Sequence, residues 1–306
     1  MREMDKLSKG TTAGMQYTRE EGVRLLSEFQ NDIIRDYKKR FNETLYDRRY
    51  FYRNLESTAD GYGLAAEHDF ILLRSHIKKI GEIIATWKSG LTGEERARHA
   101  LSRTLPGEEM ETLYGVTLSD GKERTEYDAV TITPYGVFAI EVKSYSQDMT
   151  WDEKGVIYPS YNGSWHKNLG ERMNCKEYLL RNRLKEFKDV PFYNILLIAD
   201  NRVKITDNYR RIPISYNNTI LSDIRSYSDG RRYIETEQIR VIKRVLLEET
   251  EPVLVPCPVD CSKVAEEYSW FVRMCSRKEN RSFWKKLRES IFKSPAGWDR
   301  SLTESR

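Results

Sequence analysis

The hydrophobic positions in the first ninety residues recur with the period of a helix. One series of apolar side chains, at three- and four-residue steps, consists of Leu26, Phe29, Ile33, Tyr37 and Phe41. A second series, spaced 4-3-4-3 as in a heptad seam, consists of Leu73, Ile77, Ile80, Ile84 and Trp87. The two series predict amphipathic helices that either pack against each other as a hairpin or form an interface between copies of the chain.

Two glycines interrupt the second helical pattern. Gly90 and Gly93 lie within the sequence SGLTG at residues 89–93, which predicts that the helix ends there. Thr92 is then expected to cap a further helix. Glu94 would fall in the first turn of that helix, where the helix dipole favours an acidic side chain.

Strand-like segments begin near residue 110. The runs METLYGVTL, ERTEYDAVTIT and VFAIEVKSY are separated by short turns, which predicts an antiparallel meander. Further strands are expected at residues 156–158, 192–199 and 212–215. Helices are expected at residues 171–187, 219–224 and 236–247, the last of them capped by Thr236. This order predicts an α/β (α+β) fold, with a mixed sheet flanked by helices.

Composition narrows the class of protein. Of the 306 residues 39% are hydrophobic and 32% are charged, and the apolar runs are too short to cross a membrane. The polar start of the sequence does not resemble a secretory signal, so we expect a cytoplasmic protein without a membrane partner. The net charge of +4 excludes a histone-like polycation but is compatible with a local basic patch that binds nucleic acid.

Charged residues lie inside two of the predicted strands. Asp128 lies in one, and Glu141 and Lys143 lie two positions apart in the next. Burying such groups is costly unless they are paired or bind a cation. A divalent cation between Asp128 and Glu141, with Lys143 beside an attacking water, would explain all three. The alternative is a set of cross-strand charges on a solvated surface, which contribute little.

The metal interpretation requires Asp128 and Glu141 to share a face of the sheet. A two-residue loop at Pro134 and Tyr135 would pair Asp128 directly with Glu141. A three-residue loop with Gly136 in a bulge would put them on opposite faces, unless Asp128 itself lies at a distortion. The sequence leaves these possibilities open.

Four sequence features occur together in a specific order. They are Gly93-Glu94, Tyr127-Asp128, TPYGVF at residues 133–138 and IEVKSY at residues 140–145. With these features, residues 90–250 resemble a nuclease-related domain (NERD), a branch of the PD-(D/E)xK nuclease superfamily. The resemblance implies a restriction-endonuclease-like core. A helical extension at residues 1–89 would precede this core, and a linker and helical tail at residues 251–306 would follow it.

The resemblance also implies roles for individual residues. Asp128 and Glu141 would bind Mg²⁺ or Mn²⁺, together with the backbone carbonyl of Val142. Lys143 would orient or deprotonate the hydrolytic water and stabilise charge on the phosphate. Glu94 would complete the acidic cluster from the neighbouring helix.

A basic helix follows the metal motif. Arg172 and Lys176 could contact a phosphate backbone and Tyr145 could stack on a base, although solvated charges and a half-buried aromatic ring are the alternatives. Related domains usually carry a glutamine near an Asn-Pro pair at the start of this helix. Here Asn168 is followed by neither proline nor glutamine.

These features predict a metal-dependent nuclease that hydrolyses phosphodiester bonds, in DNA rather than RNA. A partner protein or the N-terminal extension would supply its specificity, and the resemblance suggests prokaryotic DNA processing or antiviral defence. The alternative is a non-catalytic nucleic-acid-binding or scaffold subunit of a larger complex. A third hypothesis is a regulated toxin that acts on RNA.

Overall fold

The computed structural model describes residues 16–41, 48–103, 109–119, 121, 124–163, 167–228, 230–248, 250 and 252–292. The chain divides into two compact units. The helical unit consists of Arg24–Ile84 and the chain from Pro256 onward. The sheet unit consists of Gln16–Val23 and Ala85–Val255. Among the described residues, each unit is therefore assembled from two separate stretches of the sequence.

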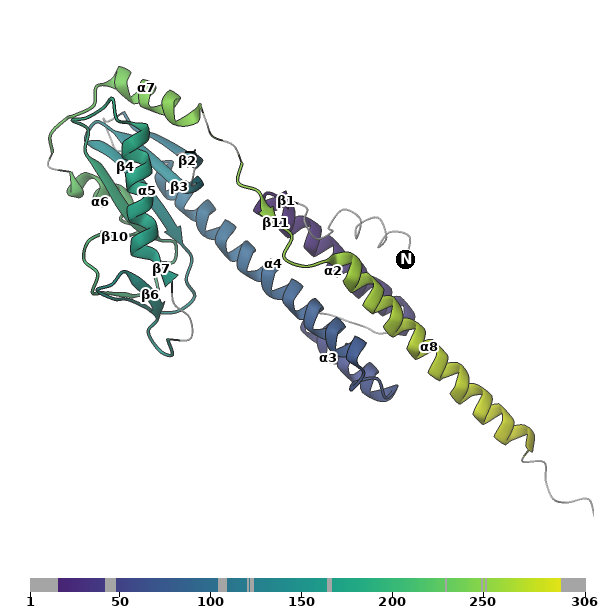
Figure 1. Ribbon diagram of the computed structural model, residues 1–306. Coiled ribbons are helices and arrows are strands. Elements are labelled where there is room, and N and C mark those ends of the chain that lie inside the picture. Colours follow the sequence, from purple (N-terminus) through teal and green to yellow (C-terminus); the bar gives the residue numbers. More distant parts are fainter. Residues whose placement is uncertain are drawn as a thin grey trace, which may run out of the picture. The chain divides into compact units, whose positions relative to one another are not determined.

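Long helices supply the helical unit (Figure 1). Those in the described part of the chain are α2 (Arg19–Phe41), α3 (Arg48–Gly61), α4 (His68–Leu101) and α8 (Cys261–Phe292). The predicted amphipathic helices are confirmed, because the following side chains are at most 2% exposed: Leu26, Phe29, Ile33, Tyr37, Leu73, Ile77, Ile80 and Ile84. None of the described helices is both long enough and apolar enough to cross a lipid bilayer.

The prediction that the second helix ends at residues 89–93 was wrong. Helix α4 continues through both glycines, and the Thr92 hydroxyl donates to the Lys88 carbonyl at 2.8 Å instead of capping a new helix. A Cβ atom added at Gly93 would lie 2.8 Å from Ser144 Cβ and 3.4 Å from Ala199 Cβ. Gly93 therefore allows α4 to lie close to the strand ends, and this tertiary packing outweighs the low helix propensity of glycine.

A five-stranded mixed sheet forms the centre of the sheet unit. Its strands are β2 (Glu111–Ser119), β3 (Arg124–Thr133), β4 (Gly136–Lys143), β8 (Phe192–Ile198) and β10 (Ile214–Tyr216). The spatial order is β10-β8-β4-β3-β2. Strands β2, β3 and β4 form the predicted antiparallel meander, whereas β8 is parallel to both β4 and β10. The central strand β4 is therefore buried on both faces.

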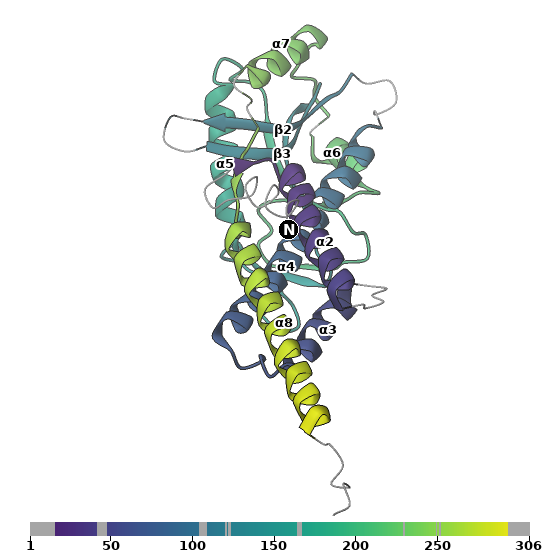
Figure 2. The same ribbon diagram turned by 90° about the vertical axis from the view of Figure 1, so that its right-hand side faces the viewer.

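Helices cover both faces of this sheet (Figures 1 and 2). Helices α5 (Leu169–Arg183) and α7 (Thr236–Leu247) cover one face, and α6 (Ile220–Tyr227) covers the other with the C-terminal part of α4. The capping residue of α7 is Glu235, one position before the expected Thr236. The expected mixed sheet flanked by helices is confirmed.

A smaller sheet extends the unit beyond the carboxyl end of β8. Its strands are β5 (Met149–Trp151), β6 (Val156–Pro159), β7 (Lys167–Asn168) and β9 (Ile205–Asp207), in the order β7-β6-β5-β9. Two further two-residue strands are β1 (Gln16–Tyr17) and β11 (Val255–Pro256). The Trp151 ring stacks on the Tyr209 ring with centroids 4.9 Å apart, in a buried cluster that includes Ile198 of β8. Of these strands, the sequence predicted only β6.

The two glycines of α4 give a matched test of this packing. We expect Gly93→Ala to lower the free energy of unfolding by about 1–3 kcal/mol, because the new methyl group would overlap Ser144. Gly90→Ala, with no atom within 4 Å of the added Cβ, should instead raise it by about 0.5–1 kcal/mol. Urea unfolding of the two variants measures the difference, and equal stability would contradict the close approach at Gly93.

Candidate active site

The loop between β3 and β4 sets the register of the candidate catalytic residues. Thr133 pairs with Gly136, so the loop contains only Pro134 and Tyr135. The pairing continues to Ala129 opposite Ile140, so Asp128 and Glu141 are the next residues of the two strands at the end of the paired segment. The two-residue loop, one of the two possibilities left open by the sequence, is therefore the one that occurs.

Strand β3 is also distorted at Asp128. Tyr127 belongs to the buried cluster beneath α5 and α7, whereas Ala129 belongs to the cluster beneath α6. A regular strand would direct both side chains to the same face, so the alternation breaks at Asp128. On the neighbouring strand, Gly115 has a left-handed φ of 62°. The Val142 amide donates to Asp128 Oδ2 at 2.7 Å, which fixes this carboxylate against β4.

Glu141 lies between two ammonium groups. Its side chain is 3% exposed, and its two carboxylate oxygens accept from Lys143 of β4 and Lys176 of α5, respectively. The Tyr127 hydroxyl donates to the Lys176 carbonyl at 2.6 Å and holds this turn of α5 against β3. Burial opposes ionisation of Glu141, but the two lysines outweigh it and lower its pKa to about 2. Glu141 is therefore a carboxylate at neutral pH.

Three other carboxyl groups in this region have a raised pKa instead of a lowered one. Burial raises the pKa of Asp128, and the charge of Glu141 raises it further. Burial and the charge of Asp128 raise the pKa of Glu94 to about 7, although Arg19 partly counteracts them. Burial also raises the pKa of Glu126. These three carboxyl groups, Asp128, Glu94 and Glu126, are called the acidic wall, because their negative charges repel one another.

Arg19 bridges this acidic wall. Its Nη1 lies 2.9 Å from Glu94 Oε1, and its Nη2 lies 3.2 Å from Glu126 Oε2. Arg19 opens α2 and reaches the site from the short Gln16–Val23 stretch of the sheet unit. The guanidinium group thus joins a residue of α4 to a residue of β3 across the mouth of the site.

One cavity of about 770 Å³ brings the predicted site residues together. All eight of them line it: Glu94, Asp128, Glu141, Val142, Lys143, Tyr145, Arg172 and Lys176. Arg19, Arg124, Glu126 and Lys167 line it as well. The cavity is therefore lined by both acidic and basic side chains, and the catalytic and binding roles of its residues stay predictions.

The sequence did not indicate Arg19 or Glu126 as site residues. Arg19 lies in a segment whose pattern is that of an ordinary amphipathic helix, and it is separated by 75 residues from Glu94. Lys176 was expected to contact phosphate, but it is 6% exposed and its ammonium group binds Glu141. Tyr145 is half-buried, and burial raises the pKa of its hydroxyl.

The site contains oxygen atoms of the kinds that bind Mg²⁺ in proteins. Among the described residues, no three His, Cys, Asp or Glu side chains gather closely enough to hold a metal by themselves. Mg²⁺ is usually held by only one or two carboxylates and keeps several waters. Asp128, Glu141 and the carbonyl of Val142 provide such a set, and Lys143 donates to that carbonyl at 3.2 Å. A cation would also relieve the charge repulsion that raises the pKa of Asp128.

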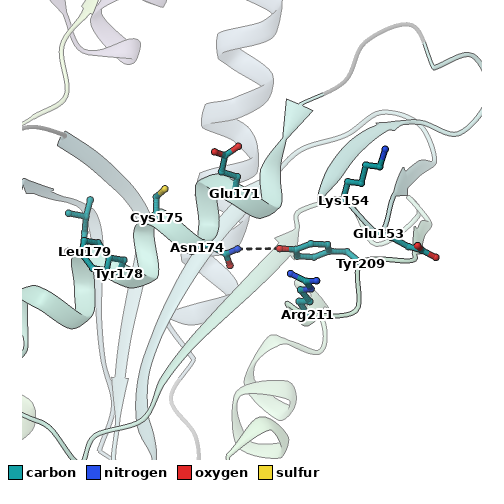
Figure 3. Close-up of a pocket in the computed structure, with 9 residues that line it drawn as sticks. All are labelled: Glu153, Lys154, Glu171, Asn174, Cys175, Tyr178, Leu179, Tyr209 and Arg211. Carbon is teal, nitrogen blue, oxygen red and sulfur yellow. Dashed lines mark hydrogen bonds between the residues drawn. The ribbon is translucent and has the colours of Figure 1, made fainter.

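Helix α5 also lines a second cavity of about 520 Å³ (Figure 3). Here Asn174 donates to the Tyr209 hydroxyl at 3.3 Å. The acidic side chains Glu153 and Glu171 lie on different sides of this hydrogen bond in Figure 3. The second cavity therefore has no counterpart of the carboxylate held between two lysines, and the larger cavity is the candidate active site.

The chain was also compared with known proteins. Residues 89–199 match the family model of the nuclease-related domain, which confirms the resemblance drawn from the sequence. No curated protein and no solved structure matches the chain. The matched segment includes Glu94, Asp128, Glu141, Lys143 and Lys176, whereas Arg19 lies outside it.

The raised pKa of Glu94 predicts a pH-dependent stability. In the folded chain Glu94 titrates at about 7 instead of 4.5, so its ionisation lowers stability progressively as the pH rises between these values. We therefore expect Glu94→Gln to gain stability relative to the unsubstituted protein over this range and to keep the gain at higher pH. Thermal unfolding in EDTA at a series of pH values measures this gain.

Glu95→Gln is the matched control, because the Glu95 side chain on the same helix is 75% exposed. The difference in stability between Glu95→Gln and the unsubstituted protein should not show the pH-dependent gain expected for Glu94→Gln. A gain in Glu94→Gln that is the same at pH 5 and pH 8 would contradict the raised pKa.

Proposed function

We propose that the nuclease-related domain of this chain hydrolyses phosphodiester bonds in nucleic acid, with Mg²⁺ or Mn²⁺ as its cofactor and DNA as its substrate. The observation that carries the proposal is the buried Glu141 carboxylate. It has Lys143 two residues further along the same strand and the fixed carboxylate of Asp128 opposite it, in one open cavity. This arrangement serves metal-assisted phosphate chemistry and has no obvious use in a purely structural sheet.

The proposed mechanism assigns a task to each residue. Asp128, Glu141 and the Val142 carbonyl would hold the divalent cation, which when bound acts as a Lewis acid and favours deprotonation of water. Lys143 would hold the attacking water and stabilise charge on the phosphate. Glu94, with a pKa of about 7, can accept or release a proton at neutral pH.

The basic wall suggests how the substrate binds. Arg124, Lys167 and Arg172, which are called the basic wall, line the same cavity and would contact the phosphate backbone. Tyr145 would pack against a base or sugar near the cleaved bond. Such contacts do not read sequence, so we propose that a partner protein or the helical unit supplies specificity. By resemblance, the biological setting would be prokaryotic DNA processing or antiviral defence.

A binding-only role is the second candidate. It is favoured by the two lysines that together engage both oxygens of Glu141, and by the absence of the glutamine that related domains usually carry. In that case the cavity would hold nucleic acid as part of a larger complex without cleaving it.

A cleavage assay separates the two candidates. The purified chain is incubated with plasmid, linear duplex, single-stranded DNA and RNA, each with Mg²⁺, Mn²⁺ or EDTA. We expect cleavage of DNA with either metal and none with EDTA. Asp128→Asn, Glu141→Gln and Lys143→Ala should each lower the rate by roughly 10²–10⁴-fold, because each removes a group acting on the reacting atoms.

Glu153→Gln, which changes a carboxylate of the second cavity, is the control and should cleave normally. Binding without cleavage under every condition would favour the scaffold role. Cleavage of RNA alone would favour the toxin hypothesis. Metal-dependent cleavage that persists in Lys143→Ala or Asp128→Asn would refute the assignment of the site.

A further inference from the structure

We propose that Arg19, which lies outside the matched domain, is a positioning residue of the active site. By bridging Glu94 and Glu126, it would neutralise the acidic wall so that a phosphate backbone can enter the cavity. The inference rests on the proposed function, because it concerns how the same cavity accepts its substrate. It makes Gln16–Val23 a functional part of the nuclease site.

The geometry of the bridge supports this role. The two guanidinium nitrogens of Arg19 contact different carboxylates, at 2.9 Å and 3.2 Å, and those carboxylates belong to different elements. The Arg19, Glu94 and Glu126 side chains are 36%, 32% and 29% exposed, so this is not a fully solvated surface contact. A planar guanidinium group can join two carboxylates at once, which the point charge of a lysine does less well.

The segment that carries Arg19 is built into the sheet unit. A Cβ atom added at Gly22 would lie 2.4 Å from the Trp87 ring, so glycine lets the first turn of α2 pack directly on α4. The Thr18 hydroxyl accepts from the Glu21 amide at 3.2 Å and caps this turn. The position of Arg19 is therefore set by packing and capping, and the residue is not the end of a loose arm.

The charges of the cavity explain why the bridge matters. Without Arg19, the carboxylates of Glu94 and Glu126 would lose the cation that bridges them, close to Asp128. Like charges in a partly buried site repel strongly, and this repulsion would weaken substrate binding before any chemistry occurs. Arg19 would thus act through the two glutamates rather than on the reacting atoms.

The test measures binding separately from cleavage. Fluorescence anisotropy with a labelled DNA duplex, in EDTA, gives the dissociation constant of the full-length chain without turnover. We expect Arg19→Ala to raise this constant by about tenfold or more, and Arg19→Lys to recover part of the loss. The double variant Arg19→Ala/Glu126→Gln should return to within about threefold of the unsubstituted protein, because the repelling charge has been removed.

Arg24→Ala is the matched control. Arg24 lies one turn further along α2 and pairs with Glu28 on the surface, so its removal should leave binding unchanged. Circular dichroism and thermal unfolding show whether each variant folds. If Arg19→Ala does not fold, Arg19→Gln and Arg19→Lys are compared at matched folded concentration.

Unchanged binding and cleavage in folded Arg19→Ala or Arg19→Gln would overturn the inference while leaving the proposed function intact. Equal loss of binding in Arg19→Ala and in the double variant would also overturn it, because Arg19 would then act on the phosphate directly. If the unsubstituted protein neither binds nor cleaves any nucleic acid, the proposed function itself fails.

Discussion

The candidate site depends on one buried carboxylate held between two ammonium groups. Glu141 can be ionised inside a sheet unit only because Lys143 and Lys176 reach its two oxygens from different elements. Lys176 joins α5 to Glu141 of β4, and the Tyr127 hydroxyl holds the same turn of α5 to β3. Removing Glu141 would leave the buried Lys176 ammonium group without its counter-ion, whereas removing either lysine would leave Glu141 paired with the other. The electrostatics of the site and the packing of this helix on the sheet are therefore the same set of contacts.

Neighbouring acids in the cavity have pKa values that are shifted in opposite directions. Glu141 stays charged, whereas the pKa values of Asp128, Glu94 and Glu126 are raised. Sites that move protons commonly contain titratable groups whose pKa values have been driven apart in this way. The lysines keep Glu141 ionised and Arg19 partly offsets the raised pKa of Glu94, so cations of the protein itself influence which acids keep their protons.

Sequence periodicity predicted most of the elements, and the motif spacing identified the two strands whose charged residues line the candidate site. The buried strand at residues 192–199 and the β2–β3–β4 meander follow directly from local patterns. The features that the sequence did not predict correctly depend on contacts between residues that are distant in sequence. From the sequence alone Gly93 is expected to end the helix, because no local pattern indicates that Ser144 and Ala199 lie against it. The distortion at Asp128 is visible only when its two neighbours are seen in different cores. No local signal connects Arg19 with an acid 75 residues away.

The order of segments along the chain has a consequence for biosynthesis. Gln16–Val23 belongs to the sheet unit, but the helical Arg24–Ile84 is made before the rest of that unit emerges. The contacts of Arg19 span 75 and 107 residues, so its bridge can form only after Glu126 has been translated. Because the two units are interleaved, no single cut in the chain separates them. A nascent chain that ends between Lys143 and Lys176 would thus contain the acidic wall and the predicted metal-binding residues, but not the second lysine that binds Glu141.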